Sequence, residues 1–209
     1  MLHYETVEQP TLELLRKLQT NDLFCNLRLV GGTSLALQIG HRISVDIDLF
    51  GELKEDTIDI NTALKEIGSF SQLKNSKNIH IYLINGVKVD IVNYQYPWLD
   101  AIVTENDFKL AGKKDIAAMK IAAITGRGSK KDFIDIYFLL KDLTLCEILE
   151  LYQKKYAEES LFMALKSLIY FDDAEKEEMP LMLLPITWNE VKNTILNNYN
   201  NYLKNNLYH

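Results

Sequence analysis

Hydrophobic residues are spaced differently in the two halves of the chain. In the first half, segments with helical spacing are interspersed with shorter runs in which every second residue is apolar, which is the pattern of half-buried strands. Helices are predicted over residues 11–20, 35–39 and 57–67, and strands over 24–30, 42–50, 78–84 and 87–94. In the second half the spacing is helical almost throughout. Helices are predicted there over residues 115–125, 131–142, 145–157 and 160–171, with a last helix from Trp188.

Turn and capping signals support several of these boundaries. Asn85-Gly86 between two alternating runs is the strongest short-range hairpin signal that a sequence offers. Thr187 and Glu190 have the spacing of a capping box, which predicts the start of the last helix. By contrast, we expect the acidic segment 172–178 to be a loop and the tail from Asn197 to fray.

The change from mixed to helical spacing falls between residues 96 and 106, a segment that contains Pro97. We therefore predict an α+β protein with two domains. Residues 1–105 are expected to form an α/β lobe with a small mixed sheet, and residues 106–209 a helical lobe. No internal repeat is evident in the sequence.

A glycine-rich turn follows the first predicted strand. Gly31-Gly32-Thr33-Ser34 stands where that strand gives way to a short helix, which Gly40 should end. Backbone N–H groups at a helix start attract phosphate, and glycine leaves room for a close approach. We expect Gly31, Gly32 and Thr33 to hold phosphates through their backbones. A hydroxyl, that of Ser34 before that of Thr33, would add a contact, and one of the two residues would cap the helix.

Two acids stand in the next predicted strand, residues 42–50. If it is regular, Ile43, Val45, Ile47 and Leu49 share one face, and Arg42, Ser44, Asp46 and Asp48 share the other. The two carboxylates then point the same way, with Cα atoms about 6.6 Å apart. Arg42 shares their face, so it is a candidate phosphate contact.

A third acid, Asp90, occupies the second arm of the predicted hairpin, on the face that it shares with Lys88 and Val92. Converging carboxylates are the ligands that Mg²⁺ or Mn²⁺ needs when it assists nucleotidyl transfer. Asp46, Asp48 and Asp90 are thus predicted metal ligands. Each motif alone also has a structural explanation: a tight turn for the glycines, a solvated strand end for Asp-x-Asp, and a protected edge strand for Asp90.

Composition narrows the class of protein. The 209 residues carry a net charge of −6, which argues against a protein that coats nucleic acid nonspecifically. A local excess of positive charge exists, however, because residues 109–131 contain seven basic residues and one acid. This basic window is either a solvated face or a local attraction for phosphates. Two isolated cysteines exclude a disulfide framework, and no apolar run could span a bilayer, so we expect a cytoplasmic protein without membrane association.

These motifs, in this order, resemble the signature of the AbiEii/AbiGii toxin family, a branch of the DNA polymerase β-like nucleotidyltransferase superfamily. The resemblance lies in residues 31–37 and 41–50, then in 115–123, which is similar to the family's Asp-x4-Lys-x2-Ala helix, and in 127–136, which is similar to its Arg-x3-Lys/Arg-Asp-x2-Asp motif. It covers roughly residues 25–140, and the last third of the chain resembles the family only in being helical.

The resemblance implies an enzyme of a type IV toxin–antitoxin or phage-defence system. It implies Mg²⁺ and a nucleoside triphosphate, an RNA acceptor such as tRNA whose 3′-hydroxyl receives the nucleotide, and a cognate antitoxin encoded nearby. Carried over by position, Asp46 and Asp48 are metal ligands and catalytic residues, Lys120 neutralises triphosphate charge, and Asp132 or Asp135 is a further catalytic carboxylate. Arg127 is a possible nucleotide contact.

Several alternatives stay open at this stage. Arg127 and Asp132 would equally suit a structural ion pair joining two helices. An enzyme that transfers AMP to a protein hydroxyl would use the same metal site. A nucleotide-sensing or antitoxin-binding module without turnover would also keep these motifs. Transfer to RNA and transfer to protein differ in which molecule carries a labelled nucleotide afterwards. A module without turnover would bind nucleotide without forming product.

Overall fold

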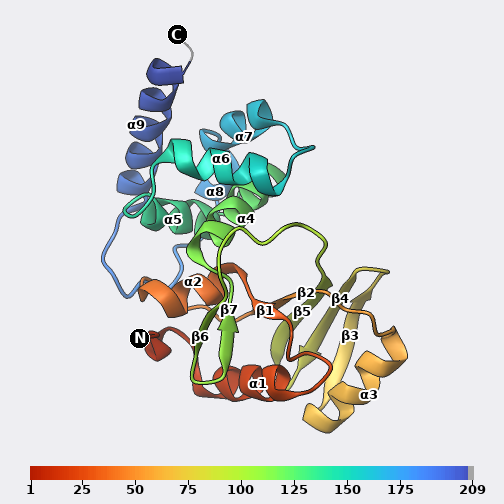
Figure 1. The fold of residues 1–209 in the computed structure, drawn as a ribbon. Coiled ribbons are helices and arrows are strands. Elements are labelled where there is room, and N and C mark those ends of the chain that lie inside the picture. Colours follow the sequence, from red (N-terminus) through yellow and green to blue (C-terminus); the bar gives the residue numbers. More distant parts are fainter. Residues whose placement is uncertain (207–209) are drawn as a thin grey trace. The chain divides into compact units, whose positions relative to one another are not determined.

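The centre of the first half of the protein is a mixed β-sheet, seen in a computed structural model that describes residues 1–206 (Figure 1). Its strands are β1 (Arg28–Leu29), β2 (Ile47–Gly51), β3 (Phe70–Asn75), β4 (Ile79–Ile84), β5 (Val87–Asn93), β6 (Val103–Glu105) and β7 (Phe108–Leu110). They are ordered β3-β4-β5-β2-β1-β7-β6. The pairs β2–β5 and β1–β7 are parallel, and the other neighbours are antiparallel.

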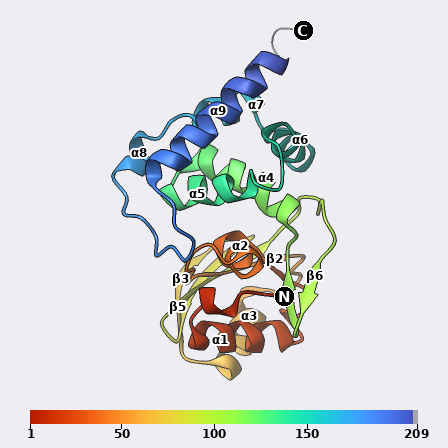
Figure 2. The same ribbon diagram turned by 90° about the vertical axis from the view of Figure 1, so that its left-hand side faces the viewer.

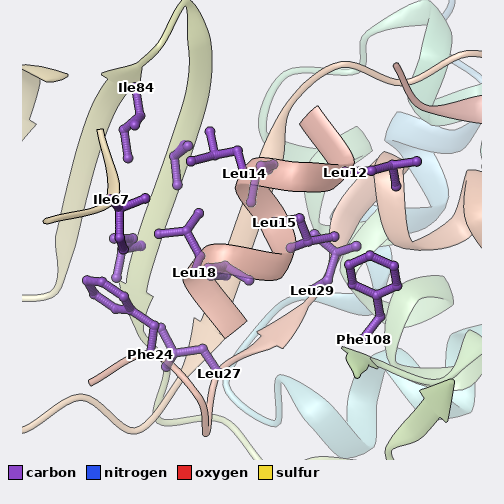
Figure 3. Packing of buried hydrophobic residues seen from close by; sticks show 14 of the residues in the cluster. Leu12, Leu14, Leu15, Leu18, Phe24, Leu27, Leu29, Ile67, Ile84 and Phe108 are labelled. Atoms are coloured by element: carbon purple, nitrogen blue, oxygen red, sulfur yellow. The ribbon is translucent and has the colours of Figure 1, made fainter. Parts of the chain in front are cut away.

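The helices of the sheet unit are the 3-10 turn η1 (Tyr4–Thr6), α1 (Gln9–Thr20), α2 (Gly31–Ile39) and α3 (Thr57–Ile67). Helices α1 and α3 lie together along one face of the sheet (Figure 2). Leu14, Leu15 and Leu18 project from α1 toward this face, where they are buried (Figure 3). Ile47 and Leu49 of β2 are buried in the same cluster. Burial of this apolar surface is the main stabilising contribution of the unit.

The predicted hairpin is confirmed. Ile84 of β4 pairs with Val87 of β5, and the two residues between them, Asn85 and Gly86, have positive φ angles of 50° and 85°. Two consecutive positive φ angles define the type I′ turn, which matches the right-handed twist of the strands. The helices predicted over 11–20 and 57–67 are also present, as α1 and α3.

The strand predicted over residues 24–30 is shorter than expected. Only Arg28 and Leu29 pair within the sheet, because residues 21–27 form turns. The N–H of Phe24 donates to the carbonyl of Asn21, and the Asn21 side chain accepts from the N–H of Leu23 at 3.0 Å. An asparagine side chain that bonds the backbone two residues later favours a turn, and here that local bond prevails over the apolar run.

Three strands of the sheet were absent from the prediction. Strand β3 is exposed and mostly polar, so it lacks an alternating apolar face. Strands β6 and β7 have three residues each and are joined through Asn106 and Asp107, both with positive φ. This hairpin begins in the segment that we expected to join two domains. Since β7 pairs with β1, residues 101–111 belong to the sheet unit together with 1–96.

The second unit comprises residues 97–100 and 112–206 and is helical. Its helices are α4 (Lys113–Gly126), α5 (Lys130–Leu139), α6 (Leu145–Lys155), α7 (Leu161–Leu168), α8 (Asp172–Glu175) and α9 (Trp188–Asn206). Each helix predicted here is present, and the fold class is confirmed as α+β. The sequence-based boundary at 105/106 falls inside the β6–β7 hairpin. In the structure, the sheet unit ends at residue 111 and the helical unit continues from residue 112.

Two predictions for the end of the chain were wrong. Part of the acidic segment 172–178 forms the short helix α8, in which Ala174 is buried. The tail does not fray at Asn197, since α9 continues to Asn206 (Figure 1). The capping box that starts α9 is confirmed by the N–H of Thr187, which donates to Glu190 Oε2 at 2.7 Å, and by the N–H of Glu190, which donates to Thr187 Oγ1 at 3.3 Å.

A buried ion pair attaches the connecting segment 97–100 to the helices of the second unit. Lys155 Nζ lies 2.6 Å from Asp115 Oδ1 and donates to the carbonyl of Pro97 at 2.7 Å. Asp115 accepts from the backbone N–H groups of Leu99 and Asp100 at 2.9 and 3.0 Å. A buried charge pair is tolerated when its remaining hydrogen-bonding capacity is satisfied, as it is here. No helix among residues 1–206 is long and apolar enough to cross a membrane.

Candidate active site

The glycine pair opens helix α2 instead of preceding it. The helix begins at Gly31 and not at Leu35 as predicted, and its N-cap residue, Val30, is extended. The N–H of Val30 donates to the carbonyl of Asp48 at 2.9 Å. The first N–H groups of any helix have no partner within the helix, so those of Gly31, Gly32 and Thr33 lie where an anion would be stabilised. The end of the helix at Gly40, with φ of 70°, is confirmed.

Neither hydroxyl caps the helix. Thr33 is buried, and its Oγ1 donates to the carbonyl of Asp46 and lies at hydrogen-bonding distance, 2.9 Å, from the hydroxyl oxygen of Ser44. Ser34 is buried as well, and its Oγ lies 3.5 Å from the carbonyl of Ala111. The prediction of a side-chain cap was wrong because both hydroxyls bond to neighbouring segments. Thr33 thereby ties the start of α2 to the residues just before β2.

A side chain approaches each of the two glycines closely. Gly31 has φ of 68°, and a Cβ at this position would collide with Asp48 Oδ2. A Cβ on Gly32 would collide with the guanidinium of Arg42. A Cβ at either position would displace the end of a neighbouring side chain, and at Gly31 the positive φ adds backbone strain. The helix start and the acidic strand are in direct contact through these positions.

The alternation predicted for residues 42–50 holds only in its second half. Strand β2 begins at Ile47, and from there Ile47 and Leu49 are buried while Asp48 is half-buried. Before it, Arg42 is buried, whereas Val45 is 55% exposed. The prediction that Arg42 shares a strand face with Asp46 was thus wrong: the arginine is instead drawn toward Gly32, and its Nη1 donates to the carbonyl of Ile43 at 3.1 Å.

The carboxylates of β2 and β5 are neighbours. Asp48 is the direct register partner of Asp90 in the parallel pair, which places their Cα atoms about 4.8 Å apart with side chains on the same face. Asp46 immediately precedes β2. Asp90 is also paired with Lys88, whose Nζ lies 2.7 Å from Asp90 Oδ1.

The acids act together on Lys88. Partial burial lowers the pKa of its ammonium, but the close contact with Asp90 and the charges of Asp90, Asp48 and Asp46 outweigh that effect, so the pKa is raised. All three carboxylates therefore contribute to the electrostatic field at the ammonium of Lys88. The hard oxygen donors fit Mg²⁺ or Mn²⁺. Within residues 1–206, however, no three acidic, histidine or cysteine side chains are already arranged around a common metal position.

Three aromatic rings continue along this face of the sheet. Phe50 is two residues beyond Asp48 in β2 and so points to the same side. Its ring centroid lies 5.3 Å from that of Tyr94, which in turn lies 5.3 Å from that of Tyr96. Tyr96 is 48% exposed. The rings form an aromatic row beside the acids, with the exposed ring at its end.

The predicted residues of the second unit form their own network. Lys120 Nζ on α4 lies 2.8 Å from Asp132 Oδ1 and 2.6 Å from Asp135 Oδ2 on α5, and all three residues are buried. Arg127 follows the end of α4, as expected from Gly126, and its Nε donates to Asp132 Oδ2 at 3.0 Å. The Arg127 side chain is 63% exposed.

The charges of this network hold Asp132 ionised. Burial would raise the pKa of its carboxyl, but the positive charge of Lys120 and the hydrogen bond and charge of Arg127 lower it to about 2. The hydroxyl of Ser129 adds a hydrogen bond to Asp132 Oδ2 at 2.7 Å. Asp132 therefore accepts from three side chains, which is the arrangement expected of a stable buried carboxylate.

Part of the basic window, residues 109–131, is paired with acids of its own unit. Lys113 pairs with Asp142 at 2.6 Å, and Lys130 is buried, with its N–H donating to Glu177 Oε2 at 2.8 Å. Lys120 and Arg127 share Asp132, as described above. Three of the seven basic side chains of the window, those of Lys113, Lys120 and Arg127, are thus paired with acids that lie outside it. A solvated basic face, one of the two explanations offered above, does not describe the buried Lys120 and Lys130.

Sequence reasoning missed the role of Lys88. The alternation of β5 already placed it on the face of Asp90, which was the available signal. It also missed Ser44 and Ser129, each of which positions a site residue through a hydroxyl. Their hydrogen bonds reach Thr33 and Asp132, and no local pattern distinguishes such serines from solvated ones.

Part of the chain matches the model of a known family, and most of it matches a related protein. Residues 13–110 match the model of the family described as nucleotidyl transferase AbiEii toxin, type IV TA system. An uncharacterized protein of Aquifex aeolicus (strain VF5) is 37% identical over 199 residues, which cover 92% of this chain and 96% of that protein.

Two solved structures have a similar fold. A candidate nucleotidyltransferase from Helicobacter pylori matches with a TM-score of 0.61 and 14% identity, over 95% of this chain and 96% of that one. MenT4, a nucleotidyltransferase toxin from Mycobacterium tuberculosis H37Rv, matches with a TM-score of 0.51 and 13% identity, over 90% of this chain and 79% of that one. At these identities the likeness concerns the fold.

Proposed function

Because the chain belongs to the AbiEii family of nucleotidyltransferase toxins, we propose that it transfers a nucleoside monophosphate from a nucleoside triphosphate to the 3′-hydroxyl of an RNA, with tRNA as the acceptor. The observation that carries this proposal is the contact of Gly31 with Asp48. It brings a phosphate-binding helix start against a carboxylate whose register partner, Asp90, is a second acid.

The two sides of this contact have complementary tasks. The N–H groups at the start of α2 would bind phosphate oxygens, and the glycines allow the phosphates to approach the backbone. Asp46 and Asp48 would hold Mg²⁺ or Mn²⁺, which supplies positive charge for the triphosphate and for the attacking oxygen when bound. Arg42, fixed against Gly32, would add positive charge beside the helix start.

In the transfer step, the 3′-hydroxyl oxygen of the acceptor forms a bond to the α-phosphorus. The bond between that phosphorus and the oxygen bridging to the β-phosphate breaks, and pyrophosphate leaves. The proton of the hydroxyl passes to solvent or to a carboxylate of the site. Little covalent chemistry is asked of the protein, so its contribution is positioning and charge neutralisation.

The base of the nucleotide or of the acceptor needs a surface as well. The aromatic row Phe50, Tyr94 and Tyr96 lies on the face of the sheet that carries Asp48 and Asp90, and its exposed ring suits stacking. Base stacking on an aromatic side chain contributes roughly 1–3 kcal/mol and tolerates any base. We assign Tyr96 this role.

In the second unit, we propose that Lys120 and Arg127 bind triphosphate charge and that Asp132 and Asp135 position Lys120. The support is the shared hydrogen bonding of these four side chains. The cognate partner of the protein is proposed to be an antitoxin, as the family's type IV toxin–antitoxin description implies.

The test is incubation with Mg²⁺, total tRNA and each α-labelled nucleoside triphosphate in turn. We expect label on tRNA with the wild-type protein and none with the D46N/D48N double variant. Asp59→Asn is the matched control, because it removes an exposed carboxylate from α3 and should leave labelling unchanged.

Other outcomes would identify a different activity. Label on protein instead of RNA would show AMP transfer to protein. Tight binding of the triphosphate without product would indicate a nucleotide-sensing or antitoxin-binding module. Absence of both label and binding would refute the proposal.

A further inference from the structure

A side chain stands in for a backbone hydrogen bond at the place where strand pairing gives way to helix α2. The hydroxyl of Thr33 donates to the backbone carbonyl of Asp46, just before β2 begins at Ile47. We infer that Thr33 is a positioning residue: its hydroxyl replaces the N–H of Gly32 in the β1–β2 ladder, so that this N–H stays at the helix start while the acid-bearing segment keeps its register. For its part in nucleotidyl transfer, the inference rests on the proposed function.

The pairing of β1 with β2 shows which bond is replaced. Val30 continues this antiparallel pair by one step, since its N–H donates to the carbonyl of Asp48 at 2.9 Å. Hydrogen-bonded pairs in an antiparallel ladder recur at every second residue. In a continued ladder, the next donor would therefore be the N–H of Gly32, and its acceptor would be the carbonyl of Asp46.

The chain does not make that backbone bond because it has already turned into α2. The helix begins at Gly31, whose φ of 68° takes the backbone out of the strand. The N–H of Gly32 is among the first of the helix, and these have no acceptor within it. One residue later, the hydroxyl of Thr33 supplies the Asp46 carbonyl with a donor.

A second hydroxyl holds the first in place. Thr33 has one hydroxyl proton and a carbonyl can only accept, so that proton is directed to Asp46. The hydroxyl of Ser44, 2.9 Å away, is then the donor to Thr33 Oγ1. Both residues are buried, and the N–H of Ser44 donates to the carbonyl of Thr6 at 2.9 Å. The two hydroxyls therefore form a fixed link that water does not compete for.

This link joins the two sides of the candidate active site through one residue. Thr33 offers its N–H at the helix start and holds the backbone of Asp46 with its side chain. A β-branched side chain has few rotamers, so the spacing between the helix start and the acid is set by a stiff connection. Without the hydroxyl, the Asp46 carbonyl loses its donor and the segment 42–46 is released from the start of α2.

Thr33→Val removes the hydroxyl and keeps the size and branching of the side chain. We expect kcat for label transfer to tRNA to fall by about 10- to 100-fold, because misplacement of a reacting group by about an ångström has effects of this size. The KM for the nucleoside triphosphate should change by less than about threefold, since the N–H groups of the helix start remain. Thr33→Ser keeps the hydroxyl and should recover most of kcat.

The hydroxyl of Ser44 provides a test of the link itself. Ser44→Ala should lower kcat less than Thr33→Val does, because the bond to Asp46 remains. In T33V/S44A the loss should equal that in T33V, since both substitutions act through one bond. The matched control is Thr62→Val, which removes an exposed hydroxyl that donates to a carbonyl of its own helix at 2.9 Å and should leave kcat and KM unchanged.

Amide hydrogen exchange of the full chain, without nucleotide, measures the positioning separately from activity. In T33V, the N–H groups of residues 43–48 should exchange about tenfold faster than in wild type, because loss of a buried hydrogen bond favours local opening. T33S and T62V should match wild type in this segment. Thermal unfolding shows whether each variant is folded. Thr33→Ala, a second variant without the hydroxyl, should behave like T33V and replaces it if T33V does not fold.

The outcomes separate the inference from the proposed function. If wild type labels tRNA and exchange in T33V equals that in wild type, the inference is overturned and the proposed function stands. A raised KM with unchanged kcat would assign the Thr33 hydroxyl to the phosphates and would also overturn it, as would faster exchange without a fall in kcat. If wild type transfers no label but exchange rises in T33V and not in T33S, the proposed function fails while the structural role of Thr33 is supported.

Discussion

Asp48 on β2 lies directly opposite Asp90 on β5 in a parallel pair, although the 35 residues from Glu52 to Gly86 separate the two strands in the sequence. The two acids differ in their surroundings. Asp48 touches Gly31 at the start of α2, whereas Asp90 is engaged by Lys88. Two carboxylates in register therefore have different described neighbours: Asp48 lies against the start of α2, and Asp90 lies against the ammonium of Lys88.

The two acids should consequently differ in their effect on activity. Asp48→Asn is expected to reduce label transfer to tRNA by more than about a hundredfold, because charge neutralisation dominates this chemistry. Asp90→Asn should leave at least about a tenth of the activity. The rates are compared under saturating Mg²⁺, with Asp59→Asn as control. Loss of activity in D90N with retention in D48N would reverse the assignment.

Gly31 should tolerate no side chain. In Gly31→Ala the new Cβ meets Asp48 Oδ2, and a positive φ alone costs an alanine about 1–2 kcal/mol. We expect the free energy of unfolding to fall by at least that amount and transfer activity to be lost. Gly126→Ala is the matched control, since no heavy atom lies near its Cβ position. Urea unfolding and label transfer measure the two effects, and unchanged values for Gly31→Ala would contradict the close approach.

Asp132 should make stability depend on acid pH. Its pKa falls from 3.8 to about 2 on folding, so its ionised form stabilises the native state above the unfolded pKa, by about 2 kcal/mol. This contribution should be present above about pH 5 and disappear as the pH falls toward 2. Asp132→Asn should therefore be less stable than wild type at pH 7, and the difference should shrink on acidification. A constant difference across this range, measured by urea unfolding, would refute the ionic role.

Variants of Lys120 should distinguish a purely structural role of this lysine from a contact with the triphosphate. Lys120→Met removes the ammonium shared by two buried carboxylates and should cost about 3–5 kcal/mol of stability. The K120M/D135N variant, with one carboxylate neutralised, should recover part of that loss. If Lys120 also binds triphosphate, as proposed, the KM for the nucleotide should stay raised in the recovered variant. A normal KM there would leave Lys120 a structural role only.

Tyr96 should affect substrate binding and little else. Tyr96→Ala removes the exposed ring of the aromatic row, and loss of one stacked base would raise the KM for nucleotide or tRNA by about 5- to 100-fold. Tyr96→Phe keeps the ring and should retain most of the binding. Mn²⁺ affinity should be the same in both variants. An unchanged KM in Tyr96→Ala for both substrates would exclude the stacking role.

Short-range signals were sufficient for part of the fold. The bounds of α3, the Asn85-Gly86 turn and the capping box at Thr187 each depend on residues a few positions apart. For these three features, residues that are close in the sequence are sufficient to specify the local structure. Strand β3 and the β6–β7 hairpin lacked such signals, because an exposed edge strand and three-residue strands have too little periodicity to recognise.

The sequence by itself determined the classes of residue in the candidate site: a glycine pair, two acids at alternating positions, a third acid on a hairpin strand, and a lysine and acids on helices. Only the tertiary structure decided how they combine. It set Asp48 in register with Asp90, engaged Asp90 with Lys88 and enclosed Lys120 between Asp132 and Asp135. Parallel pairing and ion pairs between helices join residues that are distant in the chain. The spacing of hydrophobic residues within one segment therefore cannot predict these contacts.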